Sequence, residues 1–217
     1  MSTQQKIIEL EKISQEIKSF KGIDIAKDCT HAVPGEGNPD AQVMFIGEAP
    51  GFHEDQQGRP FVGQAGKLLE KSLSEIGLKR EEVYITNIVK FRPPENRDPF
   101  PEEIEACKEW LDRQISIISP QIIATLGRFS MAKFFGPQSI SRIHGQHRKI
   151  LWKDVPVLVF PMYHPAAALR AGEVMREFIN DFQKLSHLLK SPPPTAEPLI
   201  RQDAKSTASE IDQTSLF

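Results

Sequence analysis

Three short stretches with chemically useful side chains each follow an apolar run that is typical of a β-strand. The first is Gly-Glu-Ala-Pro-Gly at residues 47–51, where glycines let the backbone approach a ligand and the carboxylate of Glu48 can orient a water molecule. The second contains Asn87, whose amide offers one acceptor and two donors and can read the edge of an imide. The third contains His164, held between Tyr163 and Pro165.

Each of these three signals also has a plain structural explanation. The first run fits an ordinary turn with a solvated glutamate, Asn87 fits a turn asparagine, and His164 fits a surface or capping histidine. Together they are more informative, because parallel α/β sheets bind ligands beyond the carboxyl ends of their strands, where all three lie.

The pattern of apolar residues predicts the elements that position these side chains. β-Branched runs indicate strands, and apolar residues at helical spacing indicate amphipathic helices. The expected strands are 43–46, 83–89 and 122–126, followed by a late pair at 149–152 and 155–160 around a tight turn; the expected helices are 5–20, 65–76, 101–118 and 174–189. This alternation predicts an α/β fold with three layers, α/β/α, in which helices cover both faces of a mostly parallel sheet.

Composition limits the class of protein. The chain has 217 residues, of which 39% are hydrophobic, so we expect one compact domain at residues 1–190 that opens with a helix within residues 1–22. The formal net charge of -2 shows no overall basic excess, so a nucleic-acid surface would have to be a local patch. Apolar runs are too short to span a bilayer and no signal peptide is evident, which predicts a cytoplasmic protein with no membrane contact.

Taken in order, the motifs resemble the uracil-DNA glycosylase superfamily, specifically its fourth branch. The similarity runs from about Pro34 to Arg170. Its other matching stretches are Gly-Glu-Gly-Asn-Pro-Asp-Ala at 35–41, Gly-Arg-Pro-Phe-Val-Gly at 58–63, residues 83–90, Arg-Pro-Pro-Glu-Asn-Arg at 92–97, residues 120–123 and the pair at 164–165. The resemblance implies a four-stranded parallel sheet between helices, and an enzyme that releases uracil from DNA and leaves an abasic site.

The resemblance implies roles for the side chains in the motifs. Glu48 is expected to position the attacking water, and His164 to hydrogen-bond the negative charge that develops on uracil O2. Phe61 is expected to stack on uracil and Asn87 to read its polar edge, with Gly47 and Ala49 completing the base pocket. Such a set suits a flipped base whose sugar passes through an oxocarbenium-like state.

A second group of residues is expected to contact DNA. Leu169 and Arg170 are placed like the family's wedge, which fills the gap left by the flipped base. Four basic residues are candidate phosphate contacts, with surface charge as the alternative for each: Lys90, Arg92, Arg97 and Arg128. Gly51, His144, Gly145 and Pro165 complete the predicted DNA-binding residues.

The cysteines depart from the family pattern. Most members of this branch hold a four-iron four-sulfur cluster on four cysteines, whereas this chain contains only Cys29 and Cys107. By comparison with the family, Phe20, Ile23 and Phe91 fall at three ligand positions and Cys107 at the fourth. We therefore expect no metal and no cofactor, with a hydrophobic plug in the place of the cluster and Cys107 packed as a small apolar residue.

A second departure is His144, in the run Ser-Arg-Ile-His-Gly at 141–145, where relatives usually have arginine. A mycobacterial-type relative uses a histidine in a similar run to attack the sugar and remain bonded to DNA, and a neutral imidazole can act as a nucleophile. That run lies soon after the second motif, whereas His144 follows the third strand and its helix. A DNA-contacting or structural histidine is therefore the main expectation, and covalent capture the alternative.

The last residues have a different composition. From residue 191 the chain is rich in Pro, Ser, Thr, Asp and Gln, which predicts a disordered tail at 191–217. Gln213, Leu216 and Phe217 resemble the peptide with which bacterial repair proteins bind the sliding clamp; the alternative is an incidental apolar terminus.

Two competing functions stay open. A catalytically silent DNA-binding protein would explain a lost cluster, but binding alone would not require Glu48, Phe61, Asn87 and His164 together. A nucleotide-binding enzyme would use glycines after the first strand, yet residues 47–51 match neither GxGxxG nor GxxxxGK[ST]. The uracil-excising enzyme, expected to be a monomer by default, is the main hypothesis.

Overall fold

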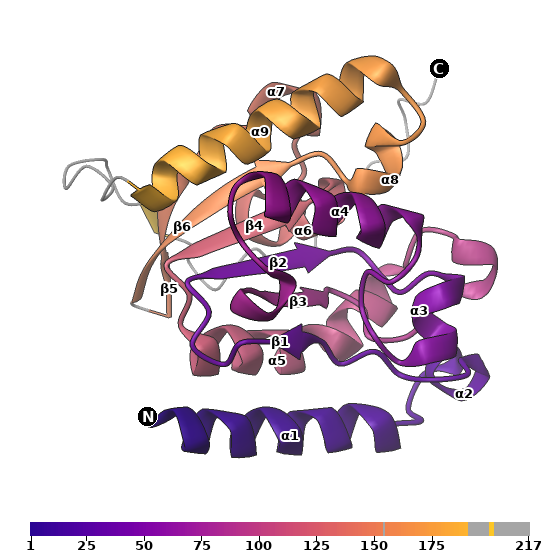
Figure 1. The fold of residues 1–217 in the computed structure, drawn as a ribbon. Coiled ribbons are helices and arrows are strands. Elements are labelled where there is room, and N and C mark those ends of the chain that lie inside the picture. Colours follow the sequence, from indigo (N-terminus) through magenta and orange to yellow (C-terminus); the bar gives the residue numbers. More distant parts are fainter. Residues whose placement is uncertain (154, 191–199, 202–217) are drawn as a thin grey trace.

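A computed structural model describes residues 1–153, 155–190 and 200–201 (Figure 1). It confirms the α/β class: a seven-stranded sheet with the order β1-β3-β2-β4-β6-β5-β7 lies between two layers of helices. The strands are β1 (Glu36–Gly37), β2 (Val43–Gly47), β3 (Tyr84–Asn87), β4 (Ile122–Leu126), β5 (Arg148–Trp152), β6 (Val155–Met162) and β7 (Ile200–Arg201).

The four inner strands are parallel, as expected from the sequence. β2 pairs with β3 and with β4, and β4 pairs with β6, all in the parallel sense. Every residue of β2, β3 and β4 is buried, which is why these strands consist of nearly continuous apolar runs rather than alternating ones. Because the strands are parallel, their carboxyl ends at Gly47, Asn87, Leu126 and Met162 meet at one edge of the sheet.

Short strands extend the sheet on both sides. β1 pairs antiparallel with β3, and β5 and β6 form the expected late antiparallel pair. β7 pairs with β5; it is the part of the tail that the structure describes, so the expected disorder elsewhere in 191–217 and the clamp peptide lie outside the described residues.

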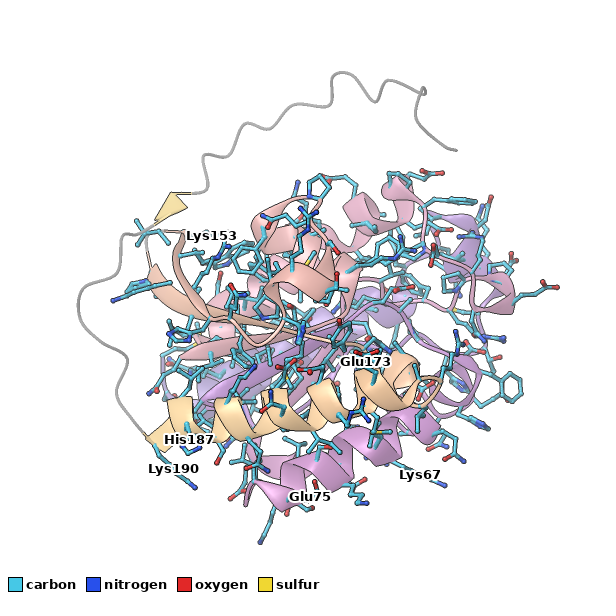
Figure 2. All side chains as sticks on the ribbon, turned by 90° about the horizontal axis from the view of Figure 1, so that it is seen from above. Lys67, Glu75, Lys153, Glu173, His187 and Lys190 are labelled. Atoms are coloured by element: carbon cyan, nitrogen blue, oxygen red, sulfur yellow. The ribbon has the colours of Figure 1, made fainter. Side chains whose placement is uncertain are left out.

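The helices cover the two faces of the sheet. Figure 1 shows α4 and α9 above it and α5 and α1 below it, and Figure 2 shows α4 beside α9 from above. The alternation of side chains along β2 explains this arrangement, since Phe45 packs in the α4 and α9 core whereas Met44 packs in the α1 and α5 core. The helices are α1 (Thr3–Ser19), α2 (Asp24–Asp28), α3 (Phe52–Gln57), α4 (Gln64–Glu75), α5 (Pro101–Ile118), α6 (Arg128–Phe135), α7 (Ile140–Ile143), α8 (Pro165–Ala168) and α9 (Gly172–Lys190).

Aromatic side chains fill the space between the end of α1, α5 and the loop after β3. The ring of Phe20 lies 5.9 Å from that of Phe91 and 5.0 Å from that of Trp110, measured between centroids. Phe91 and Cys107 are buried, and Ile23 packs against the same core. No helix in the described part of the chain is both long and apolar enough to cross a membrane.

Candidate active site

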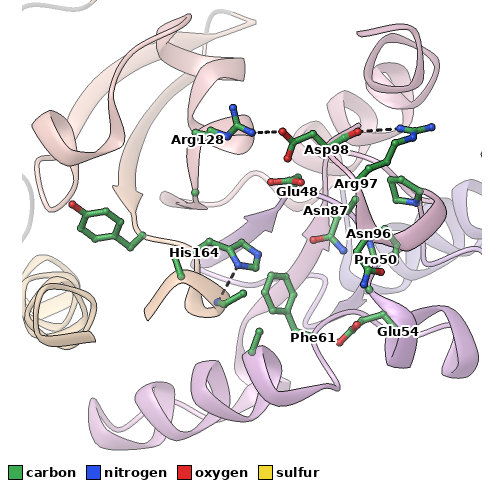
Figure 3. Close-up of a pocket in the computed structure, with 18 of the residues that line it drawn as sticks. Glu48, Pro50, Glu54, Phe61, Asn87, Asn96, Arg97, Asp98, Arg128 and His164 are labelled. Atoms are coloured by element: carbon green, nitrogen blue, oxygen red, sulfur yellow. Dashed lines mark hydrogen bonds and ion pairs between the residues drawn. The ribbon is translucent and has the colours of Figure 1, made fainter. Parts of the chain in front are cut away.

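A cavity of about 530 Å³ opens at the carboxyl ends of the parallel strands. Glu48, Phe61, Asn87 and His164 all line it, although they come from four separate stretches of the chain (Figure 3). The structure therefore brings together the four side chains that the sequence predicts to act on a base. Ala49, Gly51, Arg128 and Arg170 also line this cavity.

Asn87 ends β3 with its side chain buried beneath the cavity. Its Oδ1 has no hydrogen-bond partner among the described residues, which is rare for a buried polar atom and leaves this acceptor free to bind a donor. Gly47 lies directly opposite, because a Cβ there would stand 2.3 Å from Asn87 Oδ1 and 2.6 Å from Phe61 Cζ. Glycine at this position thus keeps the space between the amide and the aromatic ring open.

Phe61 forms the apolar wall of the cavity in an uncommon backbone conformation. Its φ is +51°, in the left-handed region that a bulky residue seldom occupies. The surrounding polar groups hold it there: Glu54 Oε1 accepts hydrogen bonds from the N–H groups of Val62 and Gly63, both at 2.8 Å, and Arg80 Nη1 donates to the carbonyl oxygen of Phe61 at 3.0 Å. The ring of Phe61 is consequently fixed 5.7 Å from that of His164.

Glu48 follows β2 and lies partly buried in the cavity. Burial raises the pKa of its carboxyl group to about 7; the charge of Asp98 raises this pKa as well, and that of Arg128 lowers it. Arg128 and Asp98 form an ion pair with each other. Figure 3 shows this pair beside Glu48, so the two charges adjust a carboxyl group that is ready to exchange a proton near neutral pH.

His164 precedes α8 and caps it. Its Nδ1 accepts a hydrogen bond from the backbone N–H of Ala166 at 3.1 Å, and burial lowers the pKa of the imidazole to about 4. A neutral ring whose Nδ1 is an acceptor carries its proton on Nε2. His164 can therefore present one N–H donor to the cavity without carrying a charge.

The arginines that the sequence predicts to contact DNA, including Arg170 of the expected wedge, fall into two groups. Arg97 and Arg128 line the cavity but are bound to carboxylates, Arg97 to Glu103 and Arg128 to Asp98. Arg92 and Arg170 form no ion pair among the residues that the structure describes. The guanidinium charges of these two residues are therefore not neutralised by a carboxylate in the described part of the chain.

Lys90 does not lie at the surface as a DNA contact would, and this expectation from the sequence is corrected. The residue is fully buried, and its Nζ donates to Thr86 Oγ1 at 2.6 Å and to Asn87 O and Gln114 Oε1 at 2.8 Å. Three acceptors match the three protons of an ammonium group, and burial lowers the pKa of the amine to about 7. Lys90 instead ties the end of β3, which carries Asn87, to α5.

His144 is not among the residues that line the cavity. Its Nδ1 lies 2.9 Å from Asp181 Oδ2, and its ring stands 4.4 Å from that of Tyr163, which does line the cavity. Gly145 is packed against Asp181, since a Cβ there would meet Asp181 Oδ1 at 2.3 Å. This arrangement holds the imidazole against α9 rather than in the base pocket.

The remaining predicted DNA contacts lie on and after α8. Pro165 is buried as the first residue of that helix, whereas the side chain of Leu169 is 47% exposed beside Arg170. Residues that line the cavity without having been predicted include Asn96, Asp98 and Tyr163. Asp98 lies only one residue beyond the Arg-Pro-Pro-Glu-Asn-Arg motif, but nothing in the sequence relates it to Glu48, 50 positions earlier.

The side chains at the family's cluster positions do not fit an iron-sulfur cluster. Phe20, Ile23 and Phe91 offer carbon only, and burial raises the pKa of the remaining thiol, Cys107, to about 11, away from the thiolate that binds metal. The described residues contain no group of three or more His, Cys, Asp or Glu side chains that could hold a metal ion.

Comparison with known proteins agrees with this geometry. Residues 34–185 match the family model described as "Uracil DNA glycosylase superfamily". The chain is 49% identical to the type-4 uracil-DNA glycosylase of Sulfurisphaera tokodaii over 84% of this chain and 86% of that protein. It is 45% identical to that of Archaeoglobus fulgidus (86% and 96% covered) and 46% identical to that of Saccharolobus solfataricus (87% and 90% covered). The chain therefore belongs to the uracil DNA glycosylase superfamily and is similar over most of its length to type-4 enzymes.

Proposed function

We propose that this protein hydrolyses the N-glycosidic bond of deoxyuridine in DNA, releasing uracil and leaving an abasic site for repair. The observation that carries the assignment of the site is the buried Oδ1 of Asn87, which has no partner among the described residues and belongs to a side chain that lines the same cavity as Phe61, Glu48 and neutral His164. An acceptor, a donor, an aromatic face and a titratable carboxyl are what a flipped uracil requires.

Asn87 and Phe61 recognise the base. The Oδ1 of Asn87 accepts from N3–H of uracil and its Nδ2–H donates to O4, while uracil stacks on Phe61. Cytosine has an acceptor at N3 and an amino group at C4, so the same amide would meet unmatched groups and leave them buried without partners. Gly47 supports this role because any side chain there would occupy the space beside Asn87 and Phe61.

His164 stabilises the leaving group. As the C1′–N1 bond breaks, its electron pair moves to uracil, and negative charge develops on O2. The Nε2–H of the neutral imidazole donates to that oxygen, a donor aimed at charge that grows in the transition state. The hydrogen bond from Ala166 to Nδ1 supports this role, since it holds the proton on the outer nitrogen.

Glu48 positions the water that attacks C1′. In its ionised form the carboxylate orients a water molecule and accepts one proton as the C1′–O bond forms, while its charge favours the oxocarbenium-like sugar. The raised pKa supports this role because a carboxyl with a pKa of about 7 exchanges protons readily at neutral pH. Leu169 and Arg170 fill the gap left by the flipped nucleotide.

A gel assay tests the activity and separates it from silent binding. A single-stranded oligonucleotide with one uracil is incubated with the protein and then treated with hot alkali. Cleavage only after alkali, lost in Asn87→Ala, is the expected result. An intact strand after alkali would favour a DNA-binding protein without activity, and a heat-stable retarded band would favour covalent capture by His144.

We also infer that the enzyme works without a cofactor, with Phe20, Ile23 and Phe91 as a plug in the place of the family's cluster and Trp110 packed against it. The stacked rings of Phe20 and Phe91, the edge-on contact of Phe20 with Trp110, and the raised pKa of the Cys107 thiol support this. Iron and sulfide analysis of protein purified without oxygen is expected to find neither at stoichiometric levels, and one cluster per chain would refute the plug.

The clamp-binding role of Gln213, Leu216 and Phe217 is proposed from the sequence alone. Deletion of residues 213–217 is expected to abolish pull-down of the sliding clamp and to leave uracil excision intact, whereas unchanged pull-down would overturn it. A monomeric state and a cytoplasmic location also remain proposals.

A further inference from the structure

Two exposed apolar side chains stand beside the cavity, each with a guanidinium that forms no ion pair among the described residues. On one side Leu169, 47% exposed, is adjacent to Arg170, which lines the cavity. On the other side Phe52, 52% exposed, follows Gly51, which also lines it. The family resemblance accounts for the Leu169 side alone.

Arg92 is the cation on the Phe52 side. Its guanidinium carbon lies 5.2 Å from the centroid of the Phe52 ring, and its Nε donates to Asn96 Oδ1 at 2.8 Å. Pro93 and Asn96 line the cavity, so Arg92 is joined to its rim by the chain at Pro93 and by its hydrogen bond to Asn96. No carboxylate binds Arg92 in the part of the chain that the structure describes.

The two pairs lie on opposite sides of the base pocket. Leu169 and Arg170 follow α8, whereas Phe52 begins α3, and both helices lie at the carboxyl-end edge of the sheet (Figure 1). In the close-up, His164 lies on one side of Phe61, and Pro50 and Asn96 lie on the other (Figure 3). A strand that delivers its uracil into the pocket from the Leu169 side therefore continues toward Phe52.

We propose that Phe52 and Arg92 form a stacking platform for an unpaired base next to the flipped uracil, with Arg92 binding the adjacent phosphate. Aromatic rings that stack bases, combined with cations that follow the backbone, are the recurring means of binding single strands. A second exposed phenylalanine of the described chain, Phe100, also faces a guanidinium, but this guanidinium belongs to Arg97 and is bound to Glu103. The inference rests on the proposed uracil excision and adds a preference for a single-stranded flank.

The consequence for substrate choice is specific. A base in a duplex is stacked on its neighbours and paired with the opposite strand, and it has to give up both interactions before it can stack on Phe52. A base in a single strand is unpaired, so moving it onto Phe52 costs less free energy. The platform therefore raises kcat/KM on single-stranded substrate more than on duplex substrate.

The test combines a change in the protein with a change in the DNA. Wild type and Phe52→Ala are compared on single-stranded oligonucleotides with one uracil. One oligonucleotide is intact. Each of the others lacks a single base, at a nucleotide one or two positions to either side of the uracil. Loss of one of these bases is expected to lower wild-type kcat/KM about tenfold, within the range for base–aromatic stacking. On the intact oligonucleotide, Phe52→Ala is expected to have the same lowered kcat/KM that wild type has on the oligonucleotide lacking that base. Loss of the base should then not lower the kcat/KM of Phe52→Ala any further. Phe52→Trp should restore the dependence on the base.

Phe100→Ala is the matched control and should keep the full dependence on the neighbouring base. The inference is overturned if Phe52→Ala depends on each neighbouring base as wild type does, or if Phe100→Ala alone loses the dependence. Excision by wild type in the same assay reports separately on the proposed function. Thermal melting of each variant verifies folding, and Phe52→Leu replaces Phe52→Ala if the latter does not fold.

Discussion

The Nδ1 of His164 accepts a hydrogen bond from the backbone N–H of Ala166, and this contact decides what the imidazole can do. With its pKa lowered to about 4 by burial, the ring is neutral at pH 7 and its single proton is on Nε2. In the proposed mechanism the histidine thus acts as a neutral donor toward uracil O2 rather than as a cation or a general base.

Replacing His164 with alanine removes that donor. We expect His164→Ala to lower kcat by about 100- to 1,000-fold, as loss of one oxyanion donor does, and to leave KM within a few-fold because the bond strengthens only in the transition state. Single-turnover excision of uracil measures the rate. His164→Gln, which can place an amide N–H near the position of Nε2, should recover part of it. Rates of His164→Ala within tenfold of wild type would refute the role.

The pH dependence of excision should follow Glu48. Since its pKa is about 7, the carboxyl is protonated below that pH, and the single-turnover rate is expected to rise with pH through about 7 as the carboxylate forms. His164 contributes no inflection in this range because its pKa lies near 4. Glu48→Gln should be slow at every pH and show no such rise.

Two charges beside Glu48 can be used to test whether this carboxyl causes the pH dependence, because their removal should shift its pKa in opposite directions. Asp98 raises the pKa of Glu48 and Arg128 lowers it. Asp98→Asn should move the rise in rate to lower pH, and Arg128→Met should move it to higher pH, with saturating DNA used so that weaker binding does not matter. Shifts in the opposite directions would show that another group titrates.

Lys90 should behave as an internal support and not as a DNA contact. Lys90→Met keeps the aliphatic volume but leaves Thr86 Oγ1, Asn87 O and Gln114 Oε1 without their donor. We expect a loss of about 3 kcal/mol in the free energy of unfolding, measured with denaturant. The slope of log K against log salt for DNA binding should be unchanged, whereas Arg170→Ala should reduce it by about 1. A reduced salt slope for Lys90→Met would show instead that Lys90 contacts a phosphate, as the sequence predicted.

The central elements could be predicted from the sequence because their physical causes are local. β4 (Ile122–Leu126) and α5 (Pro101–Ile118) have the predicted bounds, since a strand buried on both faces is an apolar run and Pro101 marks the start of its helix. β1 was not predicted, because Glu36–Gly37 is too short to show alternation and its pairing with β3 is a tertiary contact.

The site was predictable where residues act directly on the base and less so where they act through others. Lys90 was misassigned because its neighbours in the sequence, Asn-Ile-Val, do not show whether the lysine faces solvent or the protein interior. Its burial depends on Gln114, which is 24 positions away. Similarly, Glu54 and Arg80 hold the backbone around Phe61 from different elements. Supporting contacts of this kind depend on tertiary packing, which no single motif encodes.

Gly66 has the least freedom of the glycines around the base pocket. A Cβ at this position would lie 1.9 Å from the carbonyl oxygen and 2.1 Å from the carbonyl carbon of Phe61. These are backbone atoms held by Arg80, so they cannot move aside as a flexible side chain would. We expect Gly66→Ala to cost about 1–3 kcal/mol of folding stability, as overpacking does, and to lower the excision rate because the Phe61 ring is displaced.

Gly172→Ala is the matched control for this change. A Cβ at Gly172, the first residue of α9, meets no atom within 4 Å, so its effect on stability should stay within about 0.5 kcal/mol of wild type. Denaturant unfolding and single-turnover excision are measured on both variants. If Gly66→Ala were as stable and as fast as Gly172→Ala, Phe61 would not need its left-handed backbone to stack on uracil, and its ring would have to reach the base from another conformation.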